Sequence, residues 1–451
     1  MKKSYEMDMC NGPLFGKLLA FSIPLMLSGI LQLLFNAADM VVVGRFAGNT
    51  ALAAVGSTSS LINLLTNLFI GFSVGANVLV ARYYGAKKEN EVSETVHSAI
   101  LLSVLCGVVL LFLGLTVTKQ ILVWMGTPAD VLGQSALYMK IYFLGMPAML
   151  LYNFGSSILR AVGDTKRPLY YLLTAGVINV VLNLIFVIRF GMGVAGVACA
   201  TIISQMISAV LICRCLMRME GCCRMELKKL RFTADKTVQI VRIGFPAGLQ
   251  GMVFSLSNVL IQSSVNSFGS VAMAGNTAAM NIEGFVYVAM NTFHQTAMSF
   301  ISQNFGAGKQ ERIRKILFMC IGMVTVVGLV LGLAAYFAGT PLLSIYSSDT
   351  EVISYGLLRL SVICTTYCLC GIMDTMVGAL RGIGYSFMPM VVSLLGACGF
   401  RILWIFTIFQ WERSLLSLYI SYPVSWTITG LVHMLCYAIV RKKQLRRLQS
   451  C

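Results

Sequence analysis

A single acidic residue, Asp39, stands in a long apolar segment, inside the stretch AsnAlaAlaAspMetValValVal at residues 36–43. A charge at the centre of a bilayer costs about 2.5–3.5 kcal/mol on insertion scales, so such residues tend to be kept for function. Gln32, Asn36 and Asp39 are spaced i, i+4 and i+7, which places them on one face of a helix. We predict that Asp39 binds a cation or a proton and that Gln32 and Asn36 contact substrate or protons. The alternative is a hydrated carboxylate near the helix end, paired with Arg45.

The second half of the sequence also carries isolated polar residues in apolar segments. His294 titrates in the physiological range, although a lone histidine is more often a satisfied interior group. Asn258 and Gln262 share one face of a predicted helix. We predict substrate or proton contacts for these three residues, and hydrogen bonding between helices is the alternative for the two amides.

The composition indicates which structural elements hold these residues in place. Of the 451 residues, 57% are hydrophobic and 11% are charged, whereas a soluble domain carries about 25% charged residues. Apolar runs of about 20 residues are typical of membrane-spanning helices, and the runs here are too long and continuous for barrel strands. The sequence predicts an all-α integral membrane protein with about twelve spans. The approximate spans are 14–43, 51–81, 92–118, 134–159, 168–188, 192–217, 237–265, 272–303, 313–338, 352–380, 387–409 and 415–440.

The net charge of +17 does not indicate a nucleic-acid partner, because the basic residues gather at the ends of the predicted helices. Membrane proteins concentrate Lys and Arg in cytoplasmic loops. Here the basic residues cluster at both termini, in the central loop and after every second span. We therefore expect both termini and the central loop to be cytoplasmic, in a multi-pass plasma (inner) membrane protein.

An internal repeat organises the chain. ArgTyrTyrGlyAlaLysLys at 82–88 matches GlnAsnPheGlyAlaGlyLys at 303–309, and the same offset of 221 aligns Leu159-Arg160 with Leu380-Arg381. Each half contains six predicted spans, so the copies share one topology and form a parallel repeat. Such a repeat suits alternating access between two lobes.

The repeat defines three predicted parts: an N-terminal six-helix lobe at 1–218, a cytoplasmic linker at 219–236 and a C-terminal six-helix lobe at 237–451. Pro24 and Pro246 occupy corresponding positions, and each removes a helix hydrogen bond and permits a bend. We hypothesise that ion binding at Asp39 changes the bend of the first span.

The order and spacing of these features resemble the multidrug and toxic compound extrusion (MATE) family. The features that match are a proline and a later acidic residue in the first span, a Gly-Ala turn after spans two and eight, and a Leu-Arg-Gly-type turn after spans four and ten. The residues are Pro24, Asp39, Gly85-Ala86, Gly306-Ala307-Gly308, Leu159-Arg160-Ala161 and Leu380-Arg381-Gly382. The resemblance covers nearly the whole chain. A major facilitator would instead show a Gly-x-x-x-Asp-Arg-type loop after span two, which this chain lacks.

The resemblance implies a cation site in the N-terminal lobe. The matching residues are Asp39, Asn153, Asn179, Asn183 and Thr201. Oxygen ligands suit a hard cation such as Na⁺. Some family members have a second Asp where this chain has Asn183, so both Na⁺ and H⁺ stay open here. The alternative role for the asparagines is hydrogen bonding between helices, worth about 0.6 kcal/mol on average.

The repeat offset assigns a corresponding position in the second lobe to each residue of this implied site, and charged residues stand at two of the positions in this region. Asn153 maps to Asp374, and Val180, beside Asn179, maps to Arg401. We predict a buried Asp374–Arg401 ion pair in place of a cation site, with an Arg401 that extends to the surface as the alternative. The resemblance also makes Glu283 a candidate for binding substrate or protons.

The resemblance implies a secondary antiporter that exports organic, cationic or amphipathic compounds in exchange for Na⁺ or H⁺. We expect a monomer with no cofactor and no enzymatic activity. A lipid-linked precursor flippase is the main alternative, but it would line its cavity with several cations, and Arg401 is nearly the only intramembrane cation that we expect. An intramembrane enzyme using Asp39, Glu283 and His294 is less favoured, because these residues share no motif.

Overall fold

A computed structural model describes residues 5–449, and in this range the chain folds into helices without any β-strand. The elements in the N-terminal half are α1 (Leu14–Phe46), α2 (Asn49–Gly85), α3 (Glu89–Trp124), α4 (Ala129–Leu144), α5 (Met146–Ala161), α6 (Lys166–Leu184), the π-helix η1 (Ile185–Arg189) and α7 (Gly193–Arg218). After the short 3₁₀ turn η2 (Leu227–Lys229) come α8 (Ala234–Asn266), α9 (Ser270–Gly306), α10 (Gln310–Phe337), α11 (Gly339–Ser344), α12 (Thr350–Gly382), α13 (Phe387–Ser393), the π-helix η3 (Leu394–Gly399), α14 (Phe400–Phe406), α15 (Ile408–Trp411) and α16 (Leu415–Gln449).

Within the described range, ten helical segments are long and apolar enough to cross a membrane. The predicted span 134–159 is two shorter helices, α4 and α5, which meet at Gly145. The predicted span 272–303 lies inside α9, a helix of 37 residues. α9 carries buried polar residues such as Asn276, Glu283 and His294. These residues lower its mean hydropathy, so α9 is not among the ten apolar segments.

The chain forms two compact units. Unit 1 contains the residues up to Gly12 and Ile23–Met252, and unit 2 contains Pro13–Ser22 and the residues from Val253 onward. α1 and α8 each pass from one unit into the other. These are the helices that contain Pro24 and Pro246.

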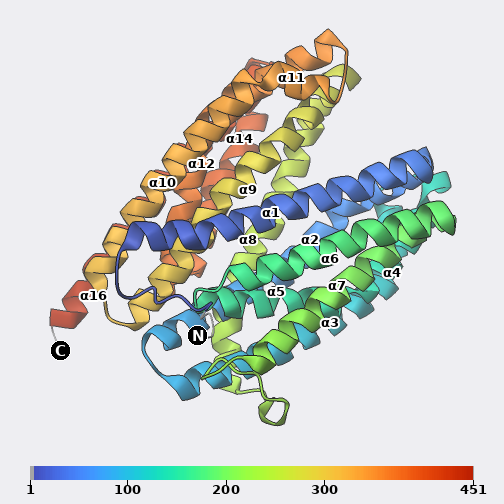
Figure 1. Cartoon of the computed structure of the whole chain (residues 1–451). Coiled ribbons are helices and arrows are strands. Elements are labelled where there is room, and N and C mark those ends of the chain that lie inside the picture. The colour runs from blue at the N-terminus through green and yellow to red at the C-terminus, as the bar shows by residue number, and fades with distance from the viewer. Residues whose placement is uncertain (1–4, 450–451) are drawn as a thin grey trace. The chain divides into compact units, whose positions relative to one another are not determined.

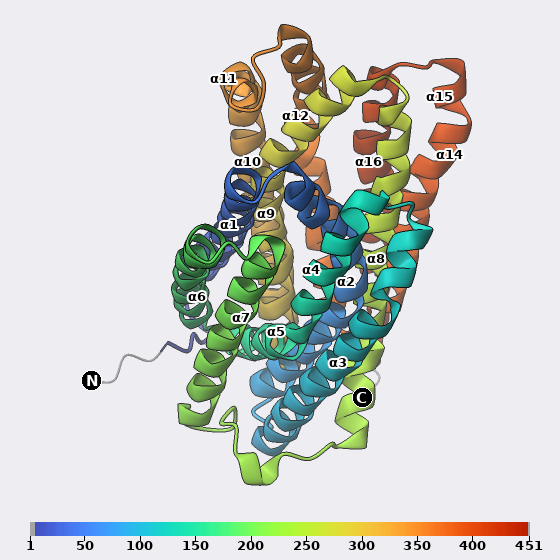
Figure 2. The same cartoon turned by 90° about the vertical axis from the view of Figure 1, so that its right-hand side faces the viewer.

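Each unit is a bundle around a central helix. In unit 1, α5 packs against α2, α3 and α7, and α6 packs against α7. In unit 2, α12 packs against α9, α10 and α16 (Figure 1). The core of unit 1 includes Leu110, Phe143 and Phe154, none of which is exposed. Figure 2 shows the same helices from the side, with the segment between α7 and α8 at one end of unit 1.

The repeat is visible in the backbone. Gly48 and Gly269 precede α2 and α9 with φ values of 90° and 95°, and Gly163 and Gly384 follow α5 and α12 with φ values of 91° and 96°. L side chains rarely adopt this left-handed region. Each pair is separated by the offset of 221 found in the sequence, so glycine meets the same backbone requirement in both halves.

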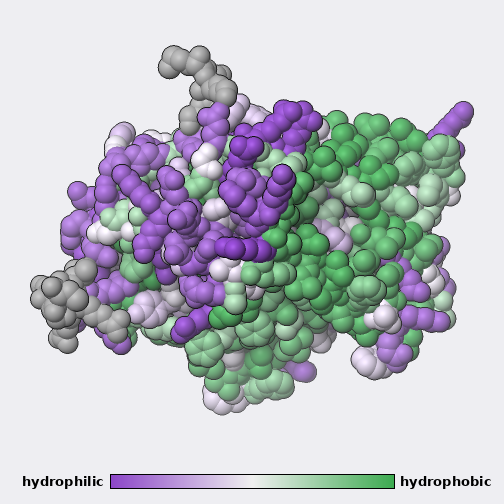
Figure 3. Space-filling view, turned by 90° about the horizontal axis from the view of Figure 1, so that it is seen from below, coloured by the Kyte–Doolittle hydropathy of each residue, from purple (hydrophilic) through white to green (hydrophobic). Residues whose placement is uncertain are grey.

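Large apolar side chains remain exposed on the helices, as a lipid solvent requires. Val210 of α7, Val326 of α10 and Leu435 of α16 are each about 60% exposed. Figure 3 shows hydrophobic residues over a broad area of one face, and hydrophilic residues gathered in a separate area.

Four glycines bring α2 and α8 into backbone contact within unit 1. Gly71 and Gly75 of α2 are four residues apart, as are Gly244 and Gly248 of α8. A Cβ atom at Gly71 would lie 2.2 Å from Gly248 N, and one at Gly248 would lie 2.2 Å from Leu68 O. This is the small-xxx-small pattern that allows close packing of membrane helices.

We expect Gly248→Ala to lower the free energy of unfolding by about 1–3 kcal/mol, because the added methyl group overpacks against backbone that cannot rotate away. Gly322 of α10 is the matched control, since a Cβ atom there meets nothing within 4 Å. Gly322→Ala should be neutral or stabilising by up to about 1 kcal/mol. Thermal unfolding of the purified proteins in detergent measures both effects. Equal unfolding midpoints for the two variants would contradict the close contact.

Candidate functional site

Four of the five predicted cation ligands form one hydrogen-bonded chain in unit 1. Asn183 Nδ2 donates to Asp39 Oδ1 and to Asn179 Oδ1, the latter at 3.3 Å. Asn179 Nδ2 donates to Thr201 Oγ1 at 3.5 Å. The two asparagines are one turn apart on α6, so both face α1 and α7. The structure therefore brings Asp39 of α1, the asparagine pair and Thr201 together.

The carbonyl oxygen of Asn183 is the unusual atom in this chain. The Asn183 side chain is fully buried, and its Oδ1 has no hydrogen-bond partner among the described residues. Both hydrogen bonds of Asn183 go to oxygen acceptors, so its amide nitrogen is the donor in each and its carbonyl oxygen is left without a donor. An unpaired buried acceptor costs about 1–3 kcal/mol. A cation beside Asp39 would satisfy this oxygen.

Asn153, the fifth predicted ligand, is not joined to this chain. Its Nδ2 donates to Met149 O at 2.9 Å on its own helix, α5. Gln32 and Asn36 are exposed, while Asp39 is half-buried. The structure therefore does not bring Gln32, Asn36 or Asn153 into the hydrogen-bonded chain.

Two tyrosines of α4 lie near Asp39 and were missed in the sequence. Tyr138 and Tyr142 lie within electrostatic range of Asp39, and their ring centroids are 5.9 Å apart. Their i, i+4 spacing was a visible signal for a shared helix face. It could not show which helix that face would meet.

Unit 2 contains a buried ion pair that involves Glu283. Arg359 of α12 donates from Nε to Glu283 Oε1 at 2.8 Å and from Nη2 to Glu283 Oε2 at 2.9 Å. Both residues are only 4% exposed. Glu283 is therefore bonded to Arg359, and its role in binding substrate or protons stays a prediction. Arg359 is a second intramembrane cation besides Arg401, and no motif in the sequence singles it out.

The pair belongs to a larger polar cluster. Arg359 Nη1 donates to Asn276 Oδ1 at 2.9 Å, and Tyr419 OH donates to the same oxygen at 3.1 Å. Asn276 Nδ2 donates to Gln262 Oε1 at 2.8 Å. Gln262 therefore links α8 to α9, which is the structural alternative considered for it, and Asn258 is exposed.

The predicted Asp374–Arg401 ion pair is not formed. Arg401 Nε donates to Ser425 Oγ at 2.9 Å, and the guanidinium carbon lies 4.1 Å from the ring centroid of Tyr422. Arg401 is 3% exposed, so the alternative of a side chain that reaches the surface is also wrong. The offset correctly placed Arg401 and Asp374 in one region of the bundle, but the direct contacts of Arg401 are with Ser425 and Tyr422 of α16.

His294 has a structural partner. Its Nδ1 bonds to Asp374 O at 2.7 Å, and the ring is 9% exposed. Asp374 O is an acceptor, so Nδ1 carries the proton in this contact. The imidazole fastens α9 to α12, and the structure gives no support to its predicted substrate role.

Comparison with known families decides the assignment. A family model described as MatE matches residues 24–185 and 246–407. The chain belongs to the MatE family. The two matches begin at Pro24 and Pro246, so the family unit occurs twice in the chain and coincides with the repeat.

Curated relatives of this MatE chain are named as multidrug proteins. "Probable multidrug resistance protein YoeA" of Bacillus subtilis is 29% identical over 437 residues, covering 95% of this chain and 94% of the relative. "Multidrug export protein MepA" of Staphylococcus saprophyticus is 22% identical and also covers 95% of this chain and 94% of the relative. The resemblance found in the sequence is therefore confirmed.

Solved MATE structures share the fold. A multidrug resistance MATE family transporter in an outward-facing conformation superimposes with a TM-score of 0.91 at 20% identity, covering 100% of both chains. A transporter from Pyrococcus furiosus, described as having a binding pocket of reverse polarity, gives a TM-score of 0.91 at 20% identity, covering 98% of this chain and 99% of that chain. At this identity the likeness supports the MATE fold alone.

Membership of the MatE family makes this chain a membrane transporter and excludes the intramembrane enzyme. MATE transporters need no cofactor for transport. Among residues 5–449, no group of three or more His, Cys, Asp or Glu side chains could hold a metal ion.

Proposed function

We propose that this MATE protein exports organic, cationic or amphipathic compounds, and that entry of Na⁺ or H⁺ at Asp39 drives the export. The observation that carries the proposal is the chain from Asp39 through Asn183 and Asn179 to Thr201, with Asn183 Oδ1 buried and unpaired. A half-buried carboxylate beside unpaired amide oxygen is a site for a small cation.

The proposed site supports both coupling ions by different means. Na⁺ would take oxygen ligands from Asp39 and Asn183, because hard cations prefer carboxylate and carbonyl oxygens. A proton would neutralise Asp39 alone. Both events remove the same net charge from unit 1, so each would alter how α1 packs around Asp39.

The basic residues support a proposed topology. Both termini and the linker at 219–236 face the cytoplasm, and the lobes at 1–218 and 237–451 alternate access across the plasma membrane as a monomer. The inner ends of the helices carry most of the Lys and Arg residues, in keeping with the orientation bias of membrane proteins.

The test is export by the purified protein in reconstituted vesicles. A fluorescent organic cation such as ethidium is followed while a Na⁺ gradient and a pH gradient are imposed separately. We expect one of the two gradients to drive uphill movement, with protein-free vesicles as the control. Absence of transport under both gradients, for ethidium and for a panel of amphipathic compounds, would contradict the proposal and direct the search to lipid-linked substrates.

A further inference from the structure

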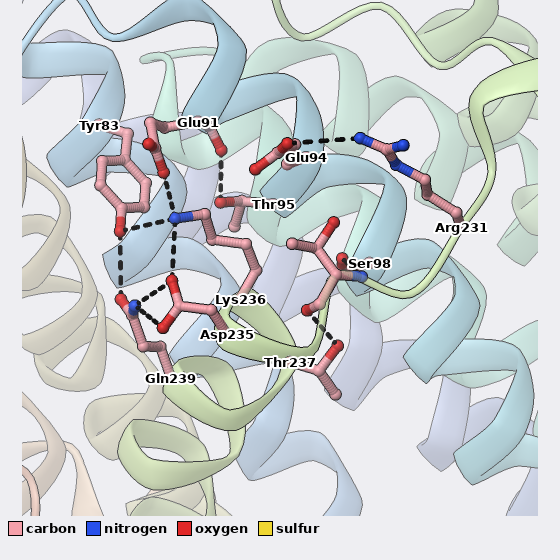
Figure 4. Close-up of polar contacts among 11 residues, drawn as sticks. Tyr83, Glu91, Glu94, Thr95, Ser98, Arg231, Asp235, Lys236, Thr237 and Gln239 are labelled. Atoms are coloured by element: carbon pink, nitrogen blue, oxygen red, sulfur yellow. Dashed lines mark hydrogen bonds and ion pairs between the residues drawn. The ribbon is translucent and has the colours of Figure 1, made fainter.

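Lys236, in the first turn of α8, is buried to an extent that is rare for lysine. It is 6% exposed, and its Nζ contacts three acceptors in unit 1. Nζ forms an ion pair with Glu91 of α3, lies 3.2 Å from Asp235 Oδ2 and lies 3.3 Å from Tyr83 OH of α2 (Figure 4). The ammonium group also lies 4.7 Å from the centroid of the Tyr83 ring. One side chain thus ties the start of α8 to both α2 and α3.

Neighbouring contacts extend this attachment along the segment that precedes α8. Thr233 N donates to Ser98 Oγ at 3.0 Å, and Glu226 N donates to His97 Nε2 at 3.1 Å. Arg231 lies 3.5 Å from Glu94. The linker is therefore docked along one face of α3 as it leads into α8.

Exposure distinguishes this ion pair from the one in unit 2. The side chains of Glu91 and Asp235 are 38% and 67% exposed, whereas the side chains of Arg359 and Glu283, taken without their backbone atoms, are 5% and 6% exposed. Water can solvate the carboxylates around Lys236 when the contact opens, so opening costs far less than it would for the fully buried pair.

We propose that the contacts of Lys236 with Glu91, Asp235 and Tyr83 form a latch that holds the cytoplasmic end of α8 on α2 and α3. These contacts must break when the transporter faces the cytoplasm. α8 enters unit 2 at Val253, so one continuous helix joins the contacts of Lys236 to unit 2. The inference rests on the proposed function, because only alternating access requires α8 to leave this position.

The test measures the latch without a substrate. Spin labels are placed at Asn90 of α3 and Val238 of α8, both exposed, after replacement of the accessible native cysteines. The wild type should give one dominant distance. Lys236→Met should raise the ratio of longer to shorter distances about tenfold, because the ion pair favours the closed state only. The double change Glu91→Gln/Asp235→Asn should do the same.

Lys229→Met is the matched control, because Lys229 pairs with Glu226 in the same segment but both side chains are well exposed, at 61% and 40%. It should leave the distances unchanged. An unchanged distribution in Lys236→Met, an equal change in Lys229→Met, or a lower unfolding midpoint without a longer distance would each overturn the latch. If the distances respond as expected but the wild type exports nothing, the latch stands and the proposed export fails. If export succeeds and Lys236→Met changes neither distances nor rate, the latch alone fails.

Discussion

Asp39→Asn is expected to reduce gradient-driven export by at least about tenfold, to the level of protein-free vesicles. The substitution keeps the shape of the side chain and leaves Oδ1 as an acceptor for Asn183, so folding should be preserved. It removes the only charge in the hydrogen-bonded chain and with it the ability to bind a cation or a proton tightly. Ethidium export in reconstituted vesicles measures the loss, and thermal unfolding checks the fold.

Asp130→Asn is the matched control for Asp39, because Asp130 is an exposed carboxylate in the first turn of α4, in the same unit. Its export rate should match the wild type. If Asp39→Asn retained full export under both gradients, ion coupling would have to lie elsewhere in the chain. The change Asn183→Leu distinguishes coupling to Na⁺ from coupling to H⁺. Removal of the amide oxygen should weaken the dependence of export on the Na⁺ gradient more than its dependence on the pH gradient.

Arg359→Met is expected to produce the largest loss of stability, about 3–5 kcal/mol, because it leaves the carboxylate of Glu283 buried without a counter-charge. Thermal unfolding in detergent should show a strongly lowered midpoint or no folded protein. Asn276 would lose its Arg359 contact but keep its bond from Tyr419. Arg413→Met, at an exposed residue between α15 and α16, should have no measurable effect.

The double change Arg359→Met/Glu283→Met distinguishes two contributions to the free energy of unfolding. One is the stabilisation by the ion pair itself, and the other is the loss caused by a single buried charge without a partner. Replacement of a whole buried ion pair by apolar residues is often neutral or stabilising. The double variant should therefore recover most of the loss seen in Arg359→Met. A double variant as unstable as the single variant would show that the cluster around Asn276 depends on the charges themselves.

The candidate site was largely foreseeable because its ligands are local signals. Asp39 is conspicuous in an apolar helix, and Asn179 and Asn183 are one turn apart, so each helix already presents its polar face. The resemblance to the MATE family assigned these faces to one point. Asn153 lies outside the hydrogen-bonded chain because its amide nitrogen donates to a backbone carbonyl one turn earlier, Met149 O, and its role as a ligand stays a prediction. A sequence offers no means of weighing that local bond against a distant ligand.

The charged residues of unit 2 were the hardest to assign. Glu283 and Arg359 are 76 residues apart, and nothing in the sequence links them. Arg401 was paired with Asp374 by the repeat offset, but the aromatic ring of Tyr422 and the hydroxyl of Ser425 hold the guanidinium instead. The repeat preserves the backbone path and not the side-chain partners.

The sequence by itself determined that lipid surrounds much of the chain, that the chain is helical and that its two halves repeat. A scarcity of charge, long apolar runs and a constant offset depend on composition and order along the chain, which no packing can change. Only the tertiary structure decided which side chains meet: Arg359 with Glu283, Lys236 with Glu91 and Tyr83, and the glycines of α2 with those of α8. These contacts depend on the rotation and height of each helix in its bundle. Helix rotation and height are set by the sum of many small packing energies, and a single residue or motif therefore does not reveal them.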